Sequence, residues 1–391
     1  MTRTATSIIP TRASPGTRDR GSWLDRRCRA ALGRHLAKLH TGRLALVENG
    51  HRQVFGSPTE DELHAQLIVH RSHFHRRATL GGSLGAAESF LQGDWSSDRL
   101  TDLLRIFIRN MDLADDLDRG PTRLAAPLLR LAHRARRNSR DGSRRNIQAH
   151  YDLGNDFFEL FLDPTMTYSC GIFKQPASSL QEASEAKLDR ICRKLQLGPE
   201  DHVLEIGTGW GSFAIHAARH HGCRVTTTTI SARQHEEAER RVASAGLSGR
   251  VQCLQRDYRD LDGKFDKLVS IEMIEAVGHA YLDTYFGKCS DLLADGGMML
   301  LQAINMNDQR YHQYLRQVDF IQRYVFPGSC CPSLSAITAS LARATDLRLF
   351  HLEEIGPHYA TTLRHWRQRL QANAGEVTAR GYPDSLLRLW D

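Results

Sequence analysis

The chain has 391 residues, of which 41% are hydrophobic, so it is long and apolar enough for a sizeable core and more than one domain. Its net charge of +7 favours an anionic partner, such as a nucleic acid or a surface of acidic phospholipids. The eight cysteines show no CxxC pair or zinc-like spacing, and no signal or membrane-spanning apolar run occurs, so we expect a cytoplasmic protein with reduced thiols.

The first part of the chain divides into three segments. Residues 1–20 lack periodic apolar positions, which predicts a disordered tail. Residues 21–115 mix helical spacing with alternating strand-like segments, which predicts a small N-terminal α+β domain. Residues 116–145 form a helical and then basic linker with six arginines from Arg134 to Arg145. This linker is either a solvated segment or a contact with phosphates or a membrane surface, and the lack of interleaved aromatic residues disfavours nucleic acid.

From residue 201 onward, short apolar strands alternate with helices. This alternation predicts an α/β fold with a doubly wound, Rossmann-like parallel sheet, whose ligands bind at the carboxyl ends of the strands. The first strand runs into a turn with Gly207, Gly209 and Gly211, where the backbone can approach a ligand closely. A plain tight turn and a dinucleotide site are alternatives. Glu205 favours S-adenosylmethionine, because a carboxylate suits its cationic methionine end.

The next two strand ends supply further cofactor candidates. The second strand ends in TTTTISARQ without the usual acidic residue, so Thr229, Ser231 and Gln234 are expected to contact a ribose at this edge. After the third strand, Asp257 can accept a hydrogen bond from an adenine amino group and Tyr258 can pack on the ring. A surface loop with a hydrophobic anchor is the alternative for this last segment.

The motifs NIQAHYDLGNDFFELFLDPTMTYSCGIF, VLEIGTGWG, DYRDLDGKFDKLVSIEMIEAVG, FIQRYVFPGSCCPS and HYATTLRHWRQRLQAN resemble those of cyclopropane-fatty-acyl-phospholipid synthases and mycolic acid cyclopropane synthases. The resemblance implies that residues 146–391 form an S-adenosylmethionine-dependent methyltransferase domain. It further implies transfer of a methyl group to the cis double bond of an unsaturated phospholipid acyl chain, with a bound bicarbonate removing a proton as a cyclopropane ring closes. Such chemistry needs an apolar tunnel and exclusion of water.

The resemblance also assigns the site residues. The bicarbonate site falls on Cys170, Glu275, Tyr359 and the backbone of Ile304. The cofactor contacts fall on these residues: Tyr168, Ser169, Gly207, Gly209, Thr229, Ile230, Gln234 and the neighbourhood of Tyr258. Each of the three bicarbonate side chains has a structural alternative, as a packed thiol, a helix-start acid or a core phenol. Glu275 follows a strand in the region where this fold binds ligands, which supports a catalytic role without the resemblance.

The sequence departs from the family pattern at the site and at the chain's end. Gln302 stands where the best-known members have a bicarbonate-binding His. Its amide can still donate one hydrogen bond at the catalytic site, but it cannot carry a proton or a positive charge. Weaker bicarbonate binding would favour a methylene branch, which a separate reductase would convert to a methyl branch. Relatives continue past the position of residue 391 with another helix and a final antiparallel strand of the sheet. Without that strand we expect an unpaired sheet edge, which is open to association, for example in a homodimer.

We therefore expect a cytoplasmic enzyme that associates peripherally with the anionic inner face of the cell membrane, takes unsaturated acyl chains, and binds no nucleic acid. The alternatives are a methyltransferase for a soluble small molecule and a non-catalytic relative that binds cofactor or lipid. His216, His220 and His221 share one helix without a nearby carboxylate ligand, so a surface role is favoured over zinc and no metal is expected.

Overall fold

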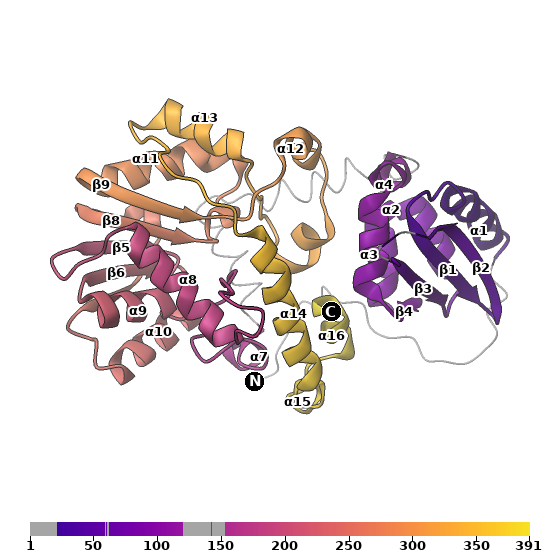
Figure 1. The fold of residues 1–391 in the computed structure, drawn as a ribbon, viewed down its shortest axis with the longest axis horizontal. Helices are drawn as coiled ribbons and strands as arrows, with labels where there is room; N and C mark the ends of the chain where they lie inside the picture. The colour runs from indigo at the N-terminus through magenta and orange to yellow at the C-terminus, as the bar shows by residue number, and fades with distance from the viewer. Residues whose placement is uncertain (1–21, 59, 61, 120–141, 143–152) are drawn as a thin grey trace. The chain divides into compact units, whose positions relative to one another are not determined.

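The computed structural model describes residues 22–58, 60, 62–119, 142 and 153–391 (Figure 1). The expected tail and most of the basic linker, with its six arginines, lie outside the described residues. The described chain forms two compact units, one combining residues 22–119 with Tyr382–Asp391 and one spanning residues 153–381. Residues 146–391 were expected to form one domain, but the last ten of them group with the N-terminal unit.

The first unit is a four-stranded mixed sheet with helices. Its sheet has the order β2-β1-β3-β4, in which only the β1–β3 pair is parallel. The elements are α1 (Trp23–Leu36), β1 (Gly42–Glu48), β2 (His51–Ser57), β3 (His64–Val69), α2 (His73–Leu91), β4 (Trp95–Ser97), α3 (Leu100–Arg109), α4 (Met111–Arg119) and α16 (Asp384–Trp390). Alternating apolar residues of β1 and β3, including Leu44, Leu46 and Leu67, pack on α1, α2 and α3 in one core. The α+β class expected from the sequence is therefore observed.

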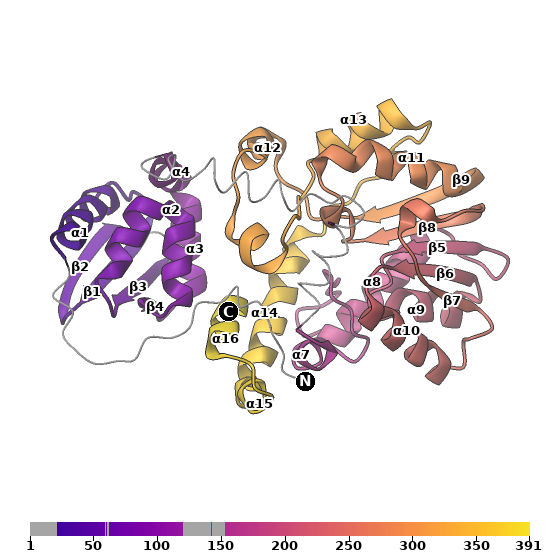
Figure 2. The ribbon, with the colours of Figure 1, turned by 180° about the vertical axis from the view of Figure 1, so that it is seen from behind.

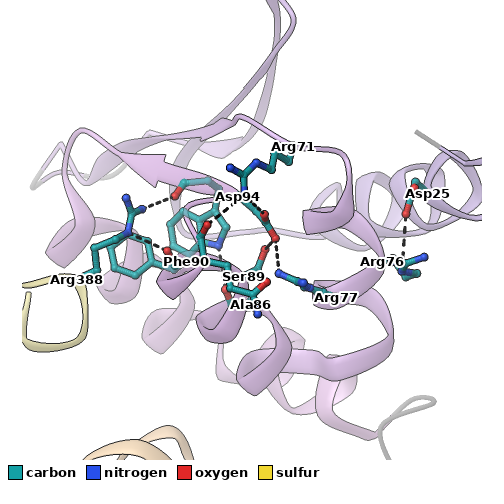
Figure 3. Close-up of polar contacts among 11 residues, drawn as sticks. Asp25, Arg71, Arg76, Arg77, Ala86, Ser89, Phe90, Asp94 and Arg388 are labelled. Carbon is teal, nitrogen blue, oxygen red and sulfur yellow. Dashed lines mark hydrogen bonds and ion pairs between the residues drawn. The ribbon is translucent and has the colours of Figure 1, made fainter. Parts of the chain in front are cut away.

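Polar contacts tie α2, β4 and α16 together in this unit (Figure 3). The buried carboxylate of Asp94 accepts hydrogen bonds from Arg77 at 2.6 Å and from the Ser89 hydroxyl at 2.9 Å. Arg388 of α16 donates to the backbone oxygens of Phe90 and Trp95, both at 2.9 Å, and its guanidinium lies 4.5 Å from the Phe90 ring centroid. The C-terminal helix is thus anchored on the N-terminal unit by charge-assisted hydrogen bonds.

The second unit is built on a five-stranded parallel sheet with the order β7-β6-β5-β8-β9. Its strands are β5 (His202–Ile206), β6 (Arg224–Thr229), β7 (Val251–Gln255), β8 (Phe265–Ile271) and β9 (Leu293–Gln302). Its α-helices are α7 (Asn155–Phe158), α8 (Leu180–Lys194), α9 (Ser212–His221), α10 (Ala232–Ser244), α11 (Leu282–Leu292), α12 (Asp308–Tyr314), α13 (Leu334–Ala344), α14 (Gly356–Ala372) and α15 (Ala374–Ala379). The doubly wound fold expected from the sequence is confirmed.

Two apolar clusters cover the two faces of this sheet. Residues of α8, α9 and α10 share one cluster, and residues of α11 and α13 share the other. Figures 1 and 2 show α14 beside the strand ends toward which the arrows of β8 and β9 point. The sites expected after β5, β6, β7, β8 and β9 therefore all lie at one edge of the sheet.

Within the described residues, the sheet ends at β9, and the segment before α14 is irregular. Leu349, Phe350 and Leu352 in this segment are 50%, 74% and 59% exposed. None of the helices in the described part of the chain combines the length and apolar character needed to span a membrane.

Candidate active site

The glycine turn after β5 has the backbone geometry that the sequence requires. Gly207, Gly209 and Gly211 have φ values of +108°, +52° and +83°, a region that residues with a side chain rarely adopt. A side chain at Gly207 would also lie 3.2 Å from Met273. The backbone N–H groups of Gly207 and Thr208 donate to the Thr228 carbonyl, so the turn is bound to the end of β6.

Glu205 of β5 is a buried acid beside this turn. Its carboxylate accepts a hydrogen bond of 2.7 Å from the Thr227 hydroxyl, and burial raises its pKa to about 8. A buried carboxyl of this kind is short of positive charge, which a cationic ligand would supply. The residues of this edge therefore fit the sulfonium and ammonium groups of S-adenosylmethionine.

Lys187 of α8 is the buried cation of the site, and the sequence analysis missed it. Its ammonium donates to the Ser169 hydroxyl at 2.8 Å, and burial lowers its pKa to about 8 despite the nearby charges of Glu272 and Glu205. The signal was present in the pattern of α8, because Lys187 lies one turn after Ala183 and one turn before Ile191 on the buried face.

The expected ribose contacts form a compact capped turn at the end of β6. The Thr229 hydroxyl donates to the side-chain oxygen of Gln234 at 2.9 Å, and Ser231 caps α10 by accepting from the Gln234 backbone N–H. All three side chains are buried, and Ile230 between them is partly buried. These residues therefore lie together at the N-terminus of α10.

The residues expected at adenine have partners of their own. The carboxylate of Asp257 is held by Arg259 through hydrogen bonds of 2.8 Å and 2.6 Å. The Tyr258 ring packs edge-on against Tyr285 at 5.5 Å. An adenine amino group would share Asp257 with Arg259, so this carboxylate is less available than the sequence indicated.

Three of the residues expected to hold bicarbonate converge on Glu272, a residue that the sequence analysis did not single out. Its carboxylate accepts from the Cys170 backbone N–H at 2.9 Å, the Gln302 amide at 2.8 Å and the Tyr359 hydroxyl at 3.4 Å. Glu272 itself has a φ of +48° at the end of β8, a backbone conformation that costs energy for a residue with a side chain. Burial raises the pKa of this carboxyl.

Glu275 and Ile304 form the second half of this cluster. The Ile304 backbone N–H donates to Oε1 of Glu275 at 2.5 Å, while Oε2 is buried without a hydrogen-bond partner. Burial, followed by repulsion from Glu272, raises the pKa of Glu275 to about 8. An unpaired buried carboxylate oxygen is expensive, which is typical of a group that meets a ligand.

Cys170 takes part through its backbone and not through its sulfur. Burial, with the nearby Glu272 charge, raises the pKa of the thiol to about 12. A thiol of this pKa carries no thiolate near neutral pH, so nucleophilic cysteine chemistry is disfavoured here.

Aromatic side chains line the neighbourhood of these acids. The Tyr168 ring lies 5.2 Å from Phe158 and 5.1 Å from Trp366, measured between centroids. Trp366 in turn stands edge-on to Tyr359, with the centroids 6.3 Å apart. These rings exclude water, and their faces attract positive charge.

Comparison with known proteins gives consistent matches over the second unit and beyond it. A family model described as mycolic acid cyclopropane synthetase matches residues 138–391. The tuberculostearic acid methyltransferase UfaA1 of Mycobacterium tuberculosis is 38% identical over 333 residues, which covers 83% of this chain and 77% of that protein. The cyclopropane-fatty-acyl-phospholipid synthase of Escherichia coli is 36% identical over 328 residues, with 83% and 81% covered.

Solved structures give a similar result. The mycolic acid cyclopropane synthase CmaA1 complexed with SAH and CTAB has a TM-score of 0.59 and is 32% identical. The match covers 63% of this chain and 90% of that structure.

Proposed function

Because the chain belongs to the mycolic acid cyclopropane synthetase family, and is thus an S-adenosylmethionine-dependent methyltransferase, we propose that it methylates the cis double bond of an unsaturated phospholipid acyl chain to form a cyclopropane. The observation that carries the proposal is the convergence of Cys170, Gln302 and Tyr359 on Glu272, beside the unpaired oxygen of Glu275. Once the cationic cofactor is bound, acids of this cluster that ionise would place negative charge where a cation develops on the alkene carbon.

S-adenosylmethionine supplies the methyl group, and the residues of the chain supply orientation and charge. Gly207 and Gly209 allow the backbone to approach the donor, and Glu205 balances its positive charge. An alkene is a poor nucleophile, so holding it against the methyl group must lower much of the barrier. The rings of Tyr168 and Trp366, whose centroids lie 5.1 Å apart, would help to exclude water and to stabilise the developing positive charge.

Within this proposal, Glu272 takes the role of the base. The Cys170 N–H, the Gln302 amide and the Tyr359 hydroxyl, which would hold a bicarbonate, all donate to Glu272 instead. These residues therefore do not fit a separate bicarbonate, and no step is assigned to one. Glu272 accepts the proton that the added methyl group loses. The electron pair of that C–H bond then forms the carbon–carbon bond that closes the ring.

A methyl-branched acyl chain is the alternative product, and two observations favour it: the replacement at Gln302 and the name of one relative. Gln302 replaces a side chain that could carry a proton, and the relative that is 38% identical is named for tuberculostearic acid. Loss of the proton to Glu272 without ring closure would leave a methylene branch on the acyl chain. A separate reductase would then have to supply the two electrons and the proton or protons that make a methyl branch.

We also propose that the protein meets its substrate at an anionic membrane surface. In α3, Leu104 and Ile108 lie one turn apart and are 54% and 64% exposed. Arg105 and Arg109 follow them directly in the sequence. An apolar pair beside cationic side chains is the pattern of a helix that rests on acidic phospholipids.

Expression in a bacterial host that lacks its own cyclopropane synthase tests the reaction. We expect a new fatty acid one CH₂ heavier than its unsaturated precursor, and derivatisation of residual double bonds separates a ring from a methylene branch. Glu275→Gln should abolish either product, whereas Glu236→Gln, an exposed acid on α10, should not. A Glu275→Gln enzyme of full activity would refute the assigned site, and unchanged lipids with the parent protein would refute the reaction.

A further inference from the structure

A cysteine on one helix and two histidines on the next helix meet in a cluster that contains none of the proposed active-site residues. Cys192 lies on α8, and His216 and His221 lie on α9. One ligand atom from each of the three side chains lies within 4.8 Å of the other two. The sequence alone gave the two histidines no third ligand, since Cys192 is distant in the chain and only the fold brings it close to them.

The two imidazoles have unused ligand atoms. The Nε2 atoms of His216 and His221 are both buried and have no hydrogen-bond partner. Buried polar groups in folded proteins are nearly always satisfied, so two such atoms on side chains that both lie beside one thiol need an explanation. A metal ion bound to both nitrogens would satisfy them together.

The donor types suit a metal, because the ring nitrogen of a neutral imidazole can donate a lone pair to the ion. Cys192 is fully buried as a thiol and would release its proton to solvent when the metal–sulfur bond forms. The three ligands themselves offer sulfur and nitrogen, which select zinc-like ions over magnesium or calcium.

We propose that Cys192, His216 and His221 bind one zinc-like divalent ion that joins the end of α9 to α8. The remaining position of a tetrahedral ion would be filled by water. Because α9 begins directly after Gly211, the ion would anchor the helix that carries the glycine turn. Its role is structural, and it lies beyond the methyl-transfer reaction.

Cobalt titration of the metal-depleted full-length protein tests the site. We expect one equivalent of Co²⁺ to give a thiolate-to-cobalt band with the visible bands of tetrahedral coordination, and one equivalent of Zn²⁺ to displace it. Zinc should raise the thermal midpoint of the protein. Cys192→Ser and His221→Ala should each weaken binding at least ~100-fold, since each removes one of three ligands.

His220→Ala is the matched control, because His220 is exposed on the same helix and lies outside the cluster. This variant should keep the bands and the stoichiometry. Circular dichroism of the metal-free variants must match that of the parent, so that lost binding reports lost ligands. Absence of a thiolate band at one equivalent, or equal affinity in Cys192→Ser, would overturn the proposal. Equal losses in the control and in His221→Ala would also overturn it.

Discussion

Four buried ionisable side chains set the electrostatics of the proposed active site. They are Lys187, Glu205, Glu272 and Glu275. Burial raises the pKa values of the three acids and lowers that of the lysine, so burial favours the neutral form of all four. A bound sulfonium cation would shift the acids toward their charged forms. The site is therefore expected to exchange protons when it binds its cofactor.

The pH dependence of cofactor binding follows from Glu205. Its raised pKa of about 8 means that the free protein holds a proton there at lower pH, which a cationic ligand must displace. Affinity for S-adenosylmethionine should therefore rise with pH, by up to about tenfold per unit below pH ~8, and then level off. Calorimetry in buffers of different ionisation enthalpy should detect the released proton.

Glu205→Gln is the control for this prediction, since the amide keeps an acceptor for Thr227 but has no proton to lose. The variant should bind more weakly with a flatter pH profile. An unchanged slope would show that another group titrates.

The proposed role of Glu272 as the base predicts a selective loss of turnover when its carboxylate is replaced. Glu272→Gln keeps the shape and one acceptor for the surrounding donors but cannot take a proton. Turnover should fall on the order of 10²- to 10⁴-fold, with little change in cofactor affinity. The parent enzyme should keep its rate in carbonate-free buffer under argon. A rate that collapses without bicarbonate and returns when it is added would refute this role.

At the scale of elements, the strands and the glycine turn could be predicted, but the partners of the acids could not. Alternating strands and helices identify the sheet, and topology then places each strand end at one edge. Lys187 and Glu272 were missed because their roles depend on tertiary packing. A lysine in an amphipathic helix looks like a solvated residue, and only the fold turns Glu272 toward Cys170 and Gln302.

Helix α3 carries the prediction for membrane contact. Replacing Leu104 and Ile108 together by serine removes exposed apolar surface, so the folded unit should lose little stability. Co-sedimentation with vesicles rich in acidic phospholipid should weaken several-fold, because each buried apolar side chain contributes to the affinity. Trp23→Ser, which alters another exposed apolar residue of the same unit, is the control. Equal vesicle binding by parent and double variant would contradict this contact.

At the scale of the whole molecule, α16 belongs to the unit formed by the start of the chain. Arg388→Ala removes two hydrogen bonds, one to the backbone of α2 and one to that of β4, and should cost about 1–3 kcal/mol of unfolding free energy in that unit. Arg388→Lys should not restore it, because an ammonium lacks the planar fork. Hydrogen exchange of the α2 and β4 amides should quicken in both variants.

Arg364→Ala, at an exposed position of α14, should leave that exchange unchanged. Slow exchange that persists in Arg388→Ala would contradict the anchoring role. The sequence did not predict that α16 packs on the N-terminal unit. The acceptors of the Arg388 hydrogen bonds are backbone oxygens, which no pattern of side chains identifies.

The docking of α16 has a consequence for how the protein is made. A ribosome delivers the chain from its N-terminus, so the mixed sheet emerges first but waits for its last helix until translation reaches Trp390. The parallel sheet can fold in the meantime. Nascent chains stalled before α16 should therefore show a protease-sensitive first unit, whereas chains that extend past α16 should show a protected one.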